Sequence, residues 1–101
     1  MAKTLGVFVT SDLHLEKLIQ LCKAAKKKDV DVRIFFSHFG VLLTQDPRFG
    51  ELEGMAKMAL CKVGFESHAL KPPVRGIGGK DFATQLRHGE MIEKSDRYVV
   101  F

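Results

Sequence analysis

The sequence has no tryptophan, one tyrosine, three prolines and only two cysteines, and it has no long apolar run. Two cysteines far apart do not make a disulfide framework, which favours a reducing compartment, so we expect a cytoplasmic protein. A membrane-spanning helix needs about 20 consecutive apolar residues, and no stretch approaches that length. The apolar stretch Leu5–Val9 leads into Ser11 and Asp12 rather than into a cleavage site, which indicates a strand and not a signal peptide. We therefore expect no membrane partner.

The sequence also lacks a large excess of positive or negative charge, since the formal net charge is only +4. Much of this excess comes from Lys23 and Lys26–Lys28, at the end of an expected helix, where cations complement the helix dipole. Nucleic-acid binding typically combines a basic groove with exposed aromatic side chains. Most of the eight phenylalanines lie instead in apolar runs typical of strands. No nucleic-acid partner is expected.

The composition is that of a folded α/β protein, with 46% hydrophobic and 28% charged residues over 101 positions. Chains of this size and composition form one globular domain, so we expect residues 1–101 to be a single α/β domain. The stretch Val32–Gly40 is the most informative part. Its apolar run predicts a strand buried on both faces, which is typical of parallel sheets. It ends in Ser37 and His38, and ligands of such sheets bind at the carboxyl ends of the strands.

Strands and helices alternate along the rest of the chain. Apolar residues at three- and four-residue spacing predict helices, and short apolar runs between turn residues predict strands. We expect Ser11 or Asp12 to cap the first helix, Gly64 to stop the second, Asp81 to cap the third and Gly89 to end it. The expected strands are Thr4–Val9, Val32–Phe36, Phe65–Leu70 and Tyr98–Phe101, and the expected helices are Leu13–Lys28, Glu51–Val63 and Phe82–His88. This alternation predicts a parallel sheet of about four to five strands with helices on both faces.

The glycine-rich loop Arg75–Lys80 is a candidate anion-binding site. Closely spaced glycines let backbone amides turn toward an anion, and a helix is expected to begin directly after the loop. The spacing fits neither a Walker loop nor a dinucleotide fingerprint, and a tight, purely structural connection remains an alternative. The candidate ligand-binding residues are His38, Arg75, Gly76, Gly78, Gly79 and Lys80.

The histidines and cysteines give weaker signals. His14, His38 and His68 fall near the carboxyl ends of the first three expected strands, but no pair has a dedicated metal-binding spacing, so no metal is expected. Cys22 lies in the apolar stripe of the first helix and is expected to be buried. Cys61 falls opposite the apolar stripe of the expected helix Glu51–Val63, which favours a covered subunit contact. A helix carboxyl end disfavours a thiolate, so an unreactive Cys61 is preferred over a reactive one.

Two segments carry a resemblance to a known family. Ile34–Leu43 (Ile-Phe-Phe-Ser-His-Phe-Gly-Val-Leu-Leu) resembles the exit of the second strand in DsrE/DsrF-like proteins, a sulfur-relay family. The glycine-rich turn Gly76–Gly79 and the ending Ser95–Phe101 (Ser-Asp-Arg-Tyr-Val-Val-Phe) resemble the same family. With the first strand and helix included, the likeness covers nearly the whole chain.

The resemblance implies a flavodoxin-like sheet and assembly into dimers, trimers or hexamers. It also implies, in active members, a cysteine that carries sulfur as a persulfide and follows the strand before the glycine-rich segment. With a third strand at Phe65–Leu70, the matching place is Ala69–Lys71, which contains no cysteine. Either Cys61 substitutes as the catalytic residue, or this chain does not carry sulfur.

The sequence therefore favours a DsrE-like, oligomeric accessory or carrier protein of sulfur or redox metabolism, lacking the usual persulfide cysteine and working with a sulfur-relay partner. A role without catalysis is preferred, and any activity would be sulfur transfer through a cysteine, with no cofactor. The alternative is a non-catalytic oligomeric module that binds a small anion or a nucleotide-like ligand at Gly76–Gly79.

Overall fold

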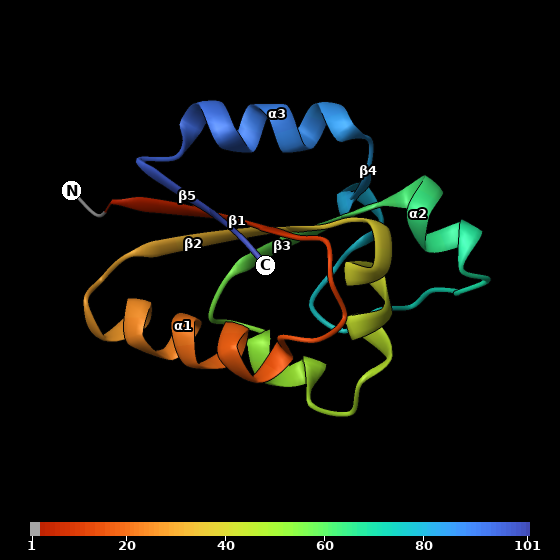
Figure 1. The fold of residues 1–101 in the computed structure, drawn as a ribbon, viewed down its shortest axis with the longest axis horizontal. Coiled ribbons are helices and arrows are strands. Elements are labelled where there is room, and N and C mark those ends of the chain that lie inside the picture. The colour runs from red at the N-terminus through yellow and green to blue at the C-terminus, as the bar shows by residue number, and fades with distance from the viewer. Residues whose placement is uncertain (1–2) are drawn as a thin grey trace.

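A five-stranded sheet forms the centre of the computed structural model, which describes residues 3–101 (Figure 1). Every pair of neighbouring strands is parallel. The strands lie in the order β4-β3-β2-β1-β5, with the bounds β1 Thr4–Val9, β2 Asp31–Phe36, β3 Lys57–Cys61, β4 Phe82–Ala83 and β5 Arg97–Val100. The predicted class, one parallel α/β sheet of the flavodoxin-like type, is confirmed.

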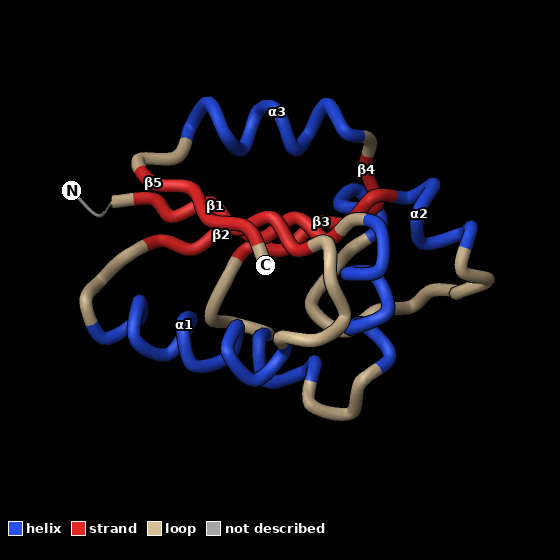
Figure 2. Tube along the Cα trace, in the orientation of Figure 1, coloured by secondary structure: helices blue, strands red, loops and turns tan. Residues whose placement is uncertain are grey.

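Helices cover both faces of the sheet, as predicted (Figure 2). One face carries α1 (Leu15–Lys27) and two short 3₁₀ helices, η1 (His38–Gln45) and η2 (Phe49–Leu52), whereas α3 (Gln85–Lys94) lies on the other face. The chain steps from β1 to β4 in one direction and then returns to the far side of β1 for β5. Right-handed crossovers in opposite directions place their helices on opposite faces, which explains the position of α3.

The main core lies between α1 and the sheet. Five residues of α1 that recur at three- and four-residue spacing are buried: Leu15, Leu18, Ile19, Cys22 and Ala25. They pack against alternate residues of the strands, including Val7, Ile34 and Leu60. The Cys22 side chain is completely buried, and this burial raises the pKa of its thiol to about 11. The prediction that Cys22 is a structural residue is confirmed.

The capping of α1 differs from the prediction. The residue at the cap position is His14, and its side chain makes no capping hydrogen bond. The Ser11 hydroxyl instead accepts a hydrogen bond from the amide of Leu13 (3.1 Å), within the loop that precedes the helix. The long connection after β2 is largely occupied by the two short helices η1 and η2.

The predicted helix Glu51–Val63 is wrong. Its first residues belong to η2 and a turn, and Gly54 has a φ of +84°, which a continuous α-helix does not allow. The apolar run Met58–Cys61 lies in β3, a strand that pairs with β2 on one side and β4 on the other. A short apolar run can satisfy both helical and strand spacing, and here the pairing with β2 decides in favour of the strand.

The predicted strand Phe65–Leu70 is also wrong, because the third strand of the sheet comes earlier in the sequence, before this segment. Residues Lys62–Ser67 form the short helix α2 directly after β3, and Gly64 lies inside this helix rather than ending it. Ala69 then adopts a φ of +58°, which is incompatible with an extended strand. The third strand of the sheet is therefore β3, not Phe65–Leu70.

The third predicted helix starts too early and ends too early. Phe82 and Ala83 form β4, and Thr84 rather than Asp81 caps α3 by accepting a hydrogen bond from the amide of Leu86 (3.3 Å). Gly89, expected to break the helix, lies inside it. Packing holds the helix together across this glycine, since the His88 ring stacks on Phe8 with ring centroids 3.7 Å apart. The last strand agrees with the prediction to within one residue at each end.

Replacing Gly89 by alanine is expected to stabilise the protein by about 0.5–1 kcal/mol, because glycine in a helix interior loses more backbone entropy on folding than alanine does. A side chain at this position meets no atom outside the helix within 4 Å. Urea unfolding of the Gly89→Ala variant measures the change. A loss of stability would contradict the assignment of Gly89 to the interior of α3.

Within residues 3–101, none of the helices combines the length and the apolar character that crossing a bilayer requires.

Candidate functional site

The carboxyl ends of β2 and β3 bring the chemically interesting side chains together. Phe36 of β2 pairs with Leu60 of β3, so Ser37 and His38 leave the sheet beside Cys61. Open parallel sheets bind their ligands at this edge because the connecting loops diverge there. Cys61 is thus the last residue of a central strand, and its expected place on the outer face of a helix is wrong.

The Cys61 side chain is held between the sheet and α3. It is 8% exposed and belongs to a small cluster with Phe35, Ala59 and Met91. Its sulfur accepts a hydrogen bond from the amide of Gly64 (3.4 Å), in the first turn of α2. The argument that a helix carboxyl end works against a thiolate at this position therefore fails, because Cys61 precedes a helix instead of ending one.

Cys61 borders a pocket of about 320 Å³. Three parts of the chain build it: the segment after β2, the end of β3 with α2, and the start of α3. The side chains that can donate or accept protons and hydrogen bonds here are those of Ser37, His38, Ser67, His68 and Gln85, together with the thiol itself. The pocket thus combines a nucleophile with two imidazoles, which are the side chains best suited to proton transfer near neutral pH.

Local interactions fix the walls of this pocket. Ser37 is buried, and its hydroxyl accepts a hydrogen bond from the side-chain amide of Gln85 (2.9 Å), which ties the start of α3 to the end of β2. His38 adopts a φ of +51°, an uncommon conformation for a residue with a side chain. The ring of the next residue, Phe39, lies 5.5 Å from the ring of His68, centroid to centroid. Backbone conformations as uncommon as that of His38 concentrate at functional sites.

Exposed apolar side chains lie at the same edge. Phe39 and Val63 both line the pocket and are 60% and 74% exposed. Leu86, which follows Gln85 in α3, is exposed to a similar degree. Large exposed apolar side chains gathered at the mouth of a pocket are typical of a surface that contacts another protein.

The residues predicted to bind an anion do not assemble into one site. His38 lines the Cys61 pocket, whereas Arg75 forms an ion pair with Glu53 (2.8 Å). Gly78 and Gly79 line a separate groove beside α2. Gly76 and Lys80 border a third depression, which lies over β2 and β3.

The three histidines expected near the carboxyl ends of strands, His14, His38 and His68, are also divided between sites. His38 and His68 share the Cys61 pocket, but His14 lies before α1, and its ring is 6.3 Å from that of Phe101. Across residues 3–101, no group of three or more histidine, cysteine, aspartate or glutamate side chains is arranged to hold a metal ion. The polar residues of the pocket that the sequence missed are Ser67 and Gln85. No signal in the sequence could single them out, because they fall inside the expected strand Phe65–Leu70 and the expected helix Phe82–His88.

The chain matches no protein-family model, and neither the curated proteins nor the solved structures contain a significant match to it.

Proposed function

We propose that this protein is a DsrE-like sulfur carrier in which Cys61 accepts sulfur as a persulfide. The observation that supports the proposal best is the position of Cys61, at the end of β3 and beside a pocket with His38 and His68. The resemblance implies a carrier cysteine that follows the strand before the glycine-rich segment, and Cys61 is the last residue of that strand, β3. Sequence reasoning missed this correspondence because it predicted the third strand at Phe65–Leu70.

The chemistry requires only groups that the pocket contains and a persulfide donor. The Cys61 thiol gives up its proton to one of the neighbouring imidazoles, and the thiolate attacks the outer sulfur of the donor persulfide. A sulfur–sulfur bond forms at Cys61 as the donor's sulfur–sulfur bond breaks, and the donor leaves as a thiolate. The step involves no net oxidation. In the second half-reaction, the thiolate of an acceptor attacks the same outer sulfur and releases Cys61.

The pocket offers space and shelter for the carried sulfur. A persulfide extends the Cys61 side chain by one sulfur–sulfur bond of about 2.05 Å. The pocket beside Cys61, with a volume of about 320 Å³, has room for this added sulfur atom. Its walls come from the segment after β2, from α2 and from the start of α3. The exposed side chains of Phe39, Val63 and Leu86 at the same edge provide an apolar surface for a relay partner or for another subunit.

Treatment of the reduced protein with glutathione persulfide is expected to add one sulfur atom, measured as a mass increase of the intact protein. The Cys61→Ser variant is expected to show no increase. The chain offers its own control in Cys22, which is fully buried and whose raised pKa keeps the thiol protonated at neutral pH. The Cys22→Ala variant should therefore gain sulfur as the unmodified protein does.

Two results would overturn the proposal. One is an unchanged mass after loading of the correctly folded protein. The other is a mass increase of equal size in Cys61→Ser, which would place the added sulfur on Cys22. Circular dichroism of each variant before loading shows that the fold is intact, so that a missing increase reports on Cys61 and not on unfolding.

A further inference from the structure

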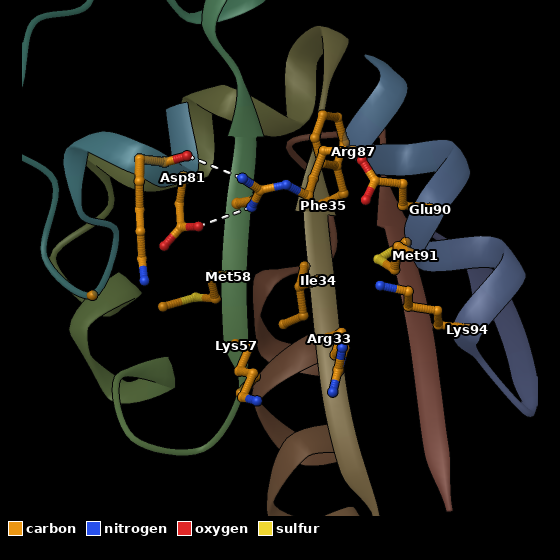
Figure 3. Close-up of a pocket in the computed structure, with 14 residues that line it drawn as sticks. Arg33, Ile34, Phe35, Lys57, Met58, Asp81, Arg87, Glu90, Met91 and Lys94 are labelled. Atoms are coloured by element: carbon orange, nitrogen blue, oxygen red, sulfur yellow. Dashed lines mark hydrogen bonds and ion pairs between the residues drawn. The ribbon is translucent and has the colours of Figure 1, made fainter. Parts of the chain in front are cut away.

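A second depression, of about 590 Å³, lies on the face of the sheet that carries α3 (Figure 3). Its floor is formed by β2 and β3, and α3 forms one side, while the segment around Gly76, Lys80 and Asp81 forms the other. None of its lining residues belongs to the Cys61 pocket. It is therefore a separate candidate site, and we call it the basic groove.

The basic groove has an excess of positive charge. Five cationic side chains and two carboxylates line it. Arg87 is already engaged, because it forms an ion pair with Asp81 (2.9 Å) and donates to the carbonyl oxygen of Lys80 (3.1 Å). In the part of the chain that the structure describes, no ion pair is formed by Lys57, Lys80 or Lys94.

The charges on the floor are arranged unfavourably for the protein alone. Arg33 of β2 and Lys57 of β3 are direct neighbours in the strand register, so their backbones are about 4.8 Å apart. Like charges directly opposite each other destabilise a sheet. Asp31 compensates the charge of Arg33 through an ion pair (3.2 Å), whereas none of the ion pairs found within residues 3–101 includes Lys57. An anion bound between Arg33 and Lys57 would remove this repulsion.

One face of α3 supplies the side wall. Arg87, Met91 and Lys94 recur at four- and three-residue spacing, so they point in the same direction, toward the sheet. Figure 3 shows Lys94 beside Met91 on the side of the helix that faces Arg33. Cations from a strand pair and from a helix thus converge on one end of the groove, and Glu90 is the only carboxylate on this wall.

Apolar atoms form the remaining surface. Phe35 and Ala59 lie along the floor and Met91 on the wall formed by α3, and all three are at least nine-tenths buried. A volume of about 590 Å³ lies within the range of roughly 300–1,000 Å³ that is typical of small-molecule sites. Such sites combine an apolar lining with a few polar groups that fix the orientation of the ligand.

We propose that the basic groove binds a phosphate-bearing small molecule of the size of a nucleoside diphosphate. Its phosphates contact Arg33, Lys57 and Lys94, and its less polar part lies over Ala59 and Met91. The concave shape and the apolar floor favour a small ligand over an acidic protein segment. The proposal does not depend on sulfur transfer by Cys61.

Isothermal titration calorimetry with ADP and with inorganic pyrophosphate, at low ionic strength, tests the proposal. Both are expected to bind, and ADP at least about tenfold more tightly, because only ADP has a part that can cover the apolar floor. The double variant Lys57→Gln/Lys94→Gln is expected to bind ADP at least about tenfold more weakly. Both lysines are exposed, and neither joins an ion pair within residues 3–101, so the variant is expected to keep the fold.

A matched control separates the groove from the overall charge. Lys17→Gln/Lys28→Gln removes the same charge from exposed positions that line no pocket described above, and it should bind ADP as the unmodified protein does. An equal loss in both double variants would overturn the proposal, as would no binding of either probe. Binding of a polyglutamate peptide in place of ADP would also overturn it, since the groove would then be a protein contact. Cys61→Ser should bind ADP normally, which distinguishes failure of this site from failure of the sulfur-carrier proposal.

Discussion

Replacement of Gly40 by alanine is expected to destabilise the protein by about 3 kcal/mol or more, because the added methyl group has no space. A Cβ atom at this position would lie 2.1 Å from the carbonyl oxygen of Val9 and 2.7 Å from its carbonyl carbon. These are backbone atoms of a central strand and cannot move aside as a flexible side chain would. The same carbonyl oxygen accepts the hydrogen bond from the amide of Ser37 (2.9 Å), so the clash also disturbs the start of the Cys61 pocket.

Urea unfolding followed by circular dichroism measures this change. Gly79→Ala is the matched control, since no atom lies within 4 Å of a Cβ placed there. It is expected to alter the free energy of unfolding by no more than about 0.5 kcal/mol. A stability of Gly40→Ala equal to that of the control would show that η1 does not lie against β1 as described.

Replacement of Phe36 by alanine is expected to lower the free energy of unfolding by about 3–5 kcal/mol, the usual cost of removing a buried aromatic side chain. Phe36 has no exposed surface, and its ring lies 5.4 Å from that of Phe49, centroid to centroid. Phe39, three residues later in the same segment, is 60% exposed. Phe39→Ala is therefore expected to cost less than about 1 kcal/mol.

The two phenylalanine variants can be compared in the same urea titration. The two variants are expected to differ in the urea concentration at the midpoint of unfolding. The dependence of the unfolding free energy on urea concentration should change little, because both variants expose a similar surface on unfolding. Equal midpoints for Phe36→Ala and Phe39→Ala would contradict the assignment of Phe36 to the buried core and of Phe39 to the exposed surface.

The sequence predicted the outer parts of the fold well and its middle poorly. The elements β1, α1, β2 and β5 were found because their patterns are long, or are bounded by clear turn residues. Between residues 51 and 70 the prediction interchanged helix and strand, since the run Met58–Cys61 satisfies both periodicities. Gly54 and Ala69 carry the decisive information through their positive φ angles, which only the structure reveals.

This error in the middle also explains what was missed at the site. An incorrect third strand placed Cys61 on a helix surface and removed it from the edge where His38 lies. The cations of the basic groove were missed for a different reason. Arg33 and Lys57 are far apart in sequence, and only the register of β2 against β3 makes them neighbours. The glycine loop drew attention because its composition is visible locally, whereas charges that meet across a sheet are not.

The central claim is that Cys61 carries sulfur inside the pocket formed with His38 and His68. The most direct test is a crystal structure of the protein after treatment with glutathione persulfide. The account predicts electron density for one additional sulfur atom bonded to the Cys61 sulfur and lying in that pocket. An unmodified Cys61 in crystals of the treated protein, or additional density at Cys22 instead, would contradict it.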